Sequence, residues 1–151
     1  MVTFPDEVDC VLRAAGWTPG RKVDAELWLA AFEAEGLQRN PVVSSFLAEF
    51  GGLAINISGA GISRAREPFE FDPLLCRGEG DRFLEWGEEI GRSIFPVGVH
   101  DRGRFFLGVD ECGELYLVET WVGSFGRMPE AMSNLIMGVQ PSVVDDGRME
   151  G

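Results

Sequence analysis

The fold of this chain is decided by two short stretches, Phe46-Leu47-Ala48-Glu49-Phe50-Gly51-Gly52-Leu53 and Gly16-Trp17-Thr18-Pro19-Gly20-Arg21. Each joins bulky apolar side chains to glycines, a combination typical of a helix end packed on a core. Neither stretch contains a nucleophile, a set of metal ligands or a phosphate-binding loop. We therefore assign structural roles to seven residues: helix ends and close packing to Gly16, Gly51 and Gly52, core anchors to Trp17 and Phe50, a turn to Gly20, and a carboxylate or carbonyl contact to Arg21.

The residues around these stretches repeat at helical spacing. Apolar side chains at i, i+3, i+4 and i+7 predict a helix over residues 8–15 that ends at Gly16. A second predicted helix starts at Asp24, ends before Gly36 and buries Leu27, Trp28, Ala31 and Phe32. A third has Asn40 as its cap, Pro41 at its first position and Gly51 at its end. The first third of the chain is therefore helical.

From Leu53 onward the apolar period becomes two, which indicates strands. The predicted strands cover residues 53–57, 69–71, 95–100, 104–109 and 114–119, with an edge strand at 121–125. Two further helices are predicted at 81–90 and 128–137. We expect one α+β domain over residues 1–141, with an antiparallel sheet of about five or six strands packed by N-terminal helices and a C-terminal helix. Residues 142–151 are expected to form a frayed polar tail.

The composition narrows the possible partners. The formal net charge is −12, so the protein repels nucleic acids and anionic membranes and attracts basic surfaces. No apolar run approaches the roughly 20 residues of a membrane span, and the N-terminus lacks the basic flank of a leader, which predicts a cytoplasmic protein.

The three cysteines are widely spaced and odd in number; we expect reduced, mostly buried thiols.

The residues offer little for catalysis, and we expect no catalytic residue, metal or cofactor. His100 is the only histidine and is predicted to lie in a surface turn. The many carboxylates lack the spacing of a calcium-binding loop and show no sign of a catalytic pair. Cys112 stands between acidic residues, which disfavour its thiolate. A binding protein is the better interpretation.

An acidic surface is the candidate binding site for such a protein. Glu85 lies three and four residues before Glu88 and Glu89, so one helix concentrates like charge that a basic partner would offset. Other acids fall in predicted turns, and Trp121 is an aromatic residue near a sheet edge. The complete set of candidate contacts is Glu85, Glu88, Glu89, Asp101, Asp110, Glu111, Glu119 and Trp121.

The chain as a whole resembles the SUKH superfamily, specifically its third subfamily of bacterial immunity proteins. The resemblance rests on five segments in order, over about residues 10–140: 15–21; Pro41 with 46–53; 69–73; 95–98; and 107–110 with 113–116. It implies an α+β fold and a non-enzymatic role, binding a cognate polymorphic toxin, such as a nuclease or a deaminase. Eukaryotic relatives regulate the cell wall, so the fold does not determine the partner.

Three hypotheses follow. The first is an immunity protein that binds and neutralises a basic toxin domain through its acidic surface. The second is a scaffold or regulatory module that binds a housekeeping partner. The third is a carboxylate-dependent hydrolase, which would need two acids converging in a cleft. The identity of the toxin and the oligomeric state are left open by the sequence.

Overall fold

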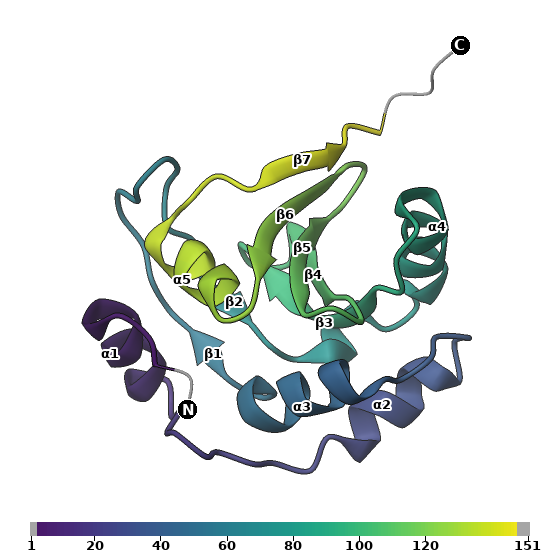
Figure 1. Cartoon of the computed structure of the whole chain (residues 1–151), viewed down its shortest axis with the longest axis horizontal. Coiled ribbons are helices and arrows are strands. Elements are labelled where there is room, and N and C mark those ends of the chain that lie inside the picture. Colours follow the sequence, from purple (N-terminus) through teal and green to yellow (C-terminus); the bar gives the residue numbers. More distant parts are fainter. Residues whose placement is uncertain (1–2, 148–151) are drawn as a thin grey trace.

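The computed structural model describes residues 3–147 and has helices on both sides of one sheet (Figure 1). Its helices are α1 (Asp6–Ala14), α2 (Glu26–Glu33), α3 (Pro41–Phe50), the short 3₁₀ helix η1 (Pro73–Cys76), α4 (Gly80–Ile90) and α5 (Glu130–Met137). Its strands are β1 (Ala54–Ile55), β2 (Phe69–Glu70), β3 (Phe95–His100), β4 (Phe105–Val109), β5 (Glu114–Val118), β6 (Val122–Arg127) and β7 (Ser142–Asp145). The strands are antiparallel and follow chain order across the sheet, which confirms the predicted α+β fold.

Local signals position the N-terminal helices. The Asn40 side chain accepts a hydrogen bond from the Val43 N–H at 2.9 Å, and α3 begins at Pro41 as predicted. The predicted inner face of α2 is right for Phe32, Trp28 and Ala31, which are buried or partly buried against the core. It is wrong for Leu27, which is 71 % exposed, while Leu29 is buried in its place.

The two glycine-containing stretches, residues 16–21 and 46–53, meet in the structure. Trp17 is buried, and its Nε1–H donates to the Glu49 carboxylate at 3.0 Å. The Arg21 guanidinium donates to the Glu49 carbonyl oxygen at 2.7 Å, which ties the turn after α1 to the end of α3. Gly51 lies directly beneath the Trp28 ring, where a Cβ atom would overlap it. This joint holds the helical third of the chain together.

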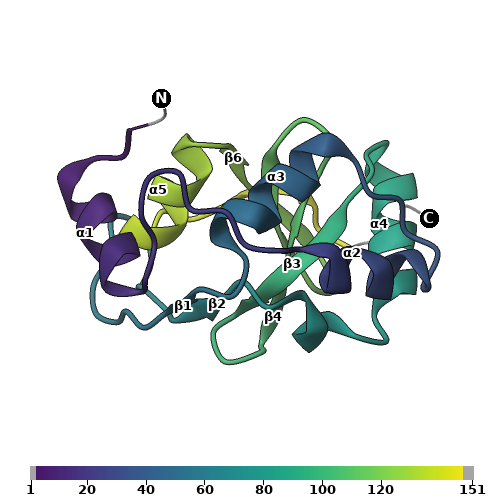
Figure 2. The ribbon, with the colours of Figure 1, turned by 90° about the horizontal axis from the view of Figure 1, so that it is seen from below.

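The sheet lies between two groups of helices. In Figure 1, α1 and α5 stand on one side of it and α4 on the other. Figure 2, seen from below, shows α2 and α3 in front of β3. Ring contacts attach these helices to the sheet side of the core, from Phe32 to Phe95 and from Phe46 to Phe71. Helix α4 packs on the sheet through Phe83, whose ring meets Phe106 at 6.1 Å. Phe106 therefore lies under a helix.

The sheet also extends further than predicted. Residues 142–145, expected in a frayed tail, form strand β7, which pairs with β6. The predicted edge strand, β6, is consequently an inner strand. The β-branched residues Val143 and Val144 favour an extended strand, so this segment pairs with the free edge of β6 despite its polar neighbours. Residues 146–147 follow this strand, and residues 148–151 of the predicted tail lie outside the described residues.

Two expectations about single residues were wrong. His100 is buried, with 3 % of its surface exposed, because it ends β3 with its ring near those of Phe69 and Phe105. Of the three cysteines only Cys76 is buried, and Cys10 and Cys112 are exposed.

None of the helices within residues 3–147 has the length and apolar character that crossing a membrane requires.

Candidate functional site

An open groove of about 1270 Å³ separates α4 from the sheet edge at β7. Helix α4 and the residue before it form one side, β7 and the residues after it form the other, and the turn between β5 and β6 also contributes. Twelve residues line the groove: Glu79, Arg82, Glu85, Trp86, Glu89, Glu119, Thr120, Val143, Val144, Asp145, Asp146 and Gly147.

The groove is strongly acidic. Six carboxylates and one guanidinium line it, a formal balance of −5 within a chain of −12. The guanidinium, that of Arg82, lies 3.0 Å from the Glu79 carboxylate and 3.3 Å from that of Glu119. Glu85 and Glu89 are exposed one helical turn apart, and neither has an ion-pair or hydrogen-bond partner within residues 3–147. Their mutual repulsion costs a few tenths of a kcal/mol, which a bound cation would offset.

Apolar surface accompanies this charge. Trp86 is half-buried, and its Nε1–H donates to the Glu119 carbonyl oxygen at 2.9 Å, which holds the indole in place. Across the groove, Val143 is 62 % exposed and Val144 is 44 % exposed. Tryptophan is enriched among the anchors of protein interfaces, and the valines across the groove add exposed apolar surface. Sequence reasoning missed all three, because Trp86 fits the buried stripe of α4 and the valines lie in a polar tail.

The predicted contact residues do not form one cluster. Glu85, Glu89 and Glu119 come together in the groove, and Glu88 is exposed on the same helix but does not line it. Asp101 lies in the turn after β3, with its carboxylate 3.4 Å from Arg104 and 3.8 Å from Arg102. Trp121 packs against Phe105, with ring centroids 6.2 Å apart. Neither Asp101 nor Trp121 lines the groove.

Asp110 was wrongly predicted as a contact, because it is completely buried. Its carboxylate accepts hydrogen bonds from the N–H groups of Cys112, at 2.8 Å, and Glu114, at 3.0 Å. The Tyr116 hydroxyl donates a third bond at 2.8 Å. Burial, followed by this bond, raises the pKa of Tyr116. These three hydrogen-bond donors belong to its own hairpin, so this side chain shapes the turn between β4 and β5; the Arg92 guanidinium lies 4.0 Å from the same carboxylate.

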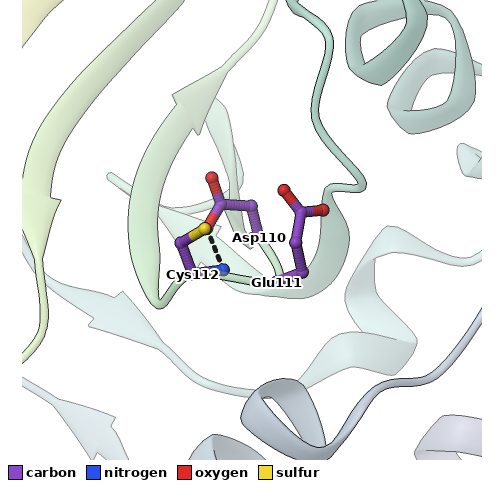
Figure 3. A group of neighbouring side chains, drawn as sticks. All are labelled: Asp110, Glu111 and Cys112. Carbon is purple, nitrogen blue, oxygen red and sulfur yellow. Dashed lines mark hydrogen bonds between the residues drawn. The ribbon is translucent and has the colours of Figure 1, made fainter.

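The neighbours of Asp110 connect that turn to the end of α4. Figure 3 shows Asp110, Glu111 and Cys112 side by side. Their carboxylate oxygens and the Cys112 sulfur, the atoms that could ligate a metal, lie within 4.8 Å of one another. The Glu111 carboxylate accepts the Ser93 N–H at 2.6 Å, and the Arg92 guanidinium donates to the Cys112 sulfur at 3.3 Å. The negative charge that Cys112 and Asp110 carry when ionised raises the pKa of Arg92. These contacts explain why Asp110, Glu111 and Cys112 cluster: they join the turn between β4 and β5 to the end of α4.

Comparison with known protein families finds a match for this chain. The model of a family described as SUKH-3 immunity protein matches residues 4–138, which include α4 and the turn between β5 and β6. Strand β7 lies beyond the matched residues. No curated protein and no solved structure matches the chain. Because the family match covers most of its length, the chain belongs to the SUKH-3 immunity protein family.

Proposed function

We propose that this protein is a non-enzymatic, cytoplasmic immunity protein that binds a cognate toxin domain and neutralises it, and that the groove between α4 and β7 is its contact surface. Membership in a family of immunity proteins supports the role. The observation that carries the location is the acidic balance of the groove, −5 over twelve lining residues, beside an exposed apolar strip.

A basic toxin domain is the partner that this groove fits. Toxins that act on nucleic acids, such as nucleases and deaminases, need basic surfaces to bind phosphates. An acidic groove attracts that same surface, raises the rate of encounter and, once bound, competes with the nucleic acid. Glu85 and Glu89 are the main candidates for this attraction, because no cation within residues 3–147 neutralises them.

The experiment that tests this proposal uses the product of the neighbouring toxin gene. Co-expression with this protein should restore growth, and the purified, catalytically inactivated toxin domain should bind it in calorimetry. The double variant Glu85→Lys/Glu89→Lys should lose rescue and bind at least tenfold more weakly. Glu88→Lys is the matched control for each single reversal, Glu85→Lys and Glu89→Lys, since it makes the same change on the same helix outside the groove. If no neighbouring product binds or is neutralised, the proposal fails.

A further inference from the structure

We propose that β7 receives an extended segment of the toxin as an additional strand, and that Lys or Arg side chains at alternate positions of this segment point towards α4. The inference rests on the proposed function, because it specifies how the same groove binds its partner. Addition of a strand to a sheet edge takes affinity from main-chain hydrogen bonds and specificity from alternate side chains.

The first observation is that β7 is an open edge. Within residues 3–147 it is the last strand of the sheet and pairs only with β6. Ser142, Val143 and Val144 are all exposed. Edge strands in natural proteins usually carry lysine or proline, which prevents pairing with another chain. The sequence Ser-Val-Val-Asp contains neither; its two valines favour strands, and its one charge, that of Asp145, is negative and so repels an acidic edge but attracts a basic segment.

The second observation is the position of the charges. Side chains of a strand alternate between the two faces of a sheet, so every second residue of an added strand would face the same side as α4. On that side the groove presents Glu85 and Glu89. Long basic side chains would reach these carboxylates while their apolar stems lie along Trp86 and the one valine of β7 that faces α4, since Val143 and Val144 point to opposite faces of the sheet. The chemistry therefore favours an extended segment in which basic residues alternate with others.

A second copy of this chain is a poorer occupant of the edge. Pairing of two β7 strands would bring together two grooves, each with a lining charge of −5. Like charges brought into one interface oppose association. Strand β7 also lies beyond residues 4–138, the part of the chain that matches the family model.

Hydrogen exchange on the complete protein tests the inference. Exchange of the amides of residues 142–147 would be measured with and without the inactivated toxin domain, and should slow at least tenfold in the complex. Val144→Lys should weaken binding by about tenfold, because it places a cation on the edge. Val42→Lys is the matched control: the same change at a valine of similar exposure, 37 % against 44 %, on α3 and outside the groove.

The outcomes separate this inference from the proposed function. Slower exchange at residues 142–147 together with sensitivity to Val144→Lys supports strand addition. Binding with unchanged exchange at these residues overturns strand addition and leaves the proposed function standing. Absence of any binding overturns both. A dimer of the isolated protein whose β7 amides already exchange slowly also overturns strand addition, since the edge is then occupied by a second copy.

Discussion

Replacement of His100 should abolish a large part of the pH dependence of stability. The imidazole is buried at the end of β3, near the rings of Phe69 and Phe105, and its Nδ1 has no hydrogen-bond partner within residues 3–147. Burial, and then the positive charge of Arg64, lower its pKa from 6.5 to about 4, against the smaller opposite effect of Asp101. The fold therefore holds the neutral form, whereas the unfolded chain is protonated at mildly acidic pH.

The sign and size of the change in stability with pH follow from the difference between the pKa of His100 in the folded and in the unfolded chain. Between the two values the unfolded chain binds more protons, so stability present above pH 6.5 is lost as the pH falls towards 4. From pH 7 to pH 5 the loss in the free energy of unfolding is about 2 kcal/mol. This is a substantial part of the roughly 5–15 kcal/mol that stabilises a typical domain.

Urea unfolding followed by circular dichroism at pH 7 and pH 5 measures this loss. The wild-type protein should lose about 2 kcal/mol more than His100→Phe or His100→Asn over this interval, because only the wild type has the titrating ring. Carboxylate effects are common to all three proteins and cancel in the comparison. Parallel losses in wild type and variants would show that His100 is not held neutral and would refute the reasoning.

Three further predictions concern the turn, the helical joint and the groove. Tyr116→Phe removes one of three hydrogen bonds to the buried Asp110 carboxylate and should lower the free energy of unfolding by roughly 2 kcal/mol in urea; no change would mean that the bond is not formed. Gly51→Ala places a Cβ against the Trp28 ring and should cost about 1–3 kcal/mol, seen as a lower melting temperature. Toxin binding should weaken as sodium chloride rises, mainly through the association rate, and Glu85→Gln should flatten this dependence in stopped-flow measurements.

The helices and inner strands could be predicted because their signals are local. The Asn40 cap, the proline after it and the glycine at the end of α3 lie within the helix or directly beside it. The short apolar runs of β3, β4 and β5, bounded by turn residues, are equally local signals, and their predicted bounds agree with the structure to within one residue. Strand β7 was missed because it is only two valines between polar residues, so only its pairing partner β6 reveals it.

The candidate site was less predictable than the fold. Glu85 and Glu89 follow from charge and helical spacing alone, but nothing local distinguishes them from Glu88. Asp110 looked like a turn acid on the surface, and only the Tyr116 hydroxyl and two backbone N–H groups, brought together by the hairpin, show why it is buried. Burial of a carboxylate depends on donors that a sequence pattern does not display.

The sequence alone determined the α+β class, the order of helices and strands, the acidic character and the resemblance that the family match confirmed. These properties depend on composition, on periodicity and on caps a few residues long. Only the tertiary structure decided which carboxylates share a surface, because α4 is placed by contacts such as that of Arg82 with Glu119, 37 residues apart, and of Trp86 with the Glu119 carbonyl, 33 residues apart. The two opening stretches thus define the scaffold, and the groove arises where α4, the turn after β5 and β7 meet.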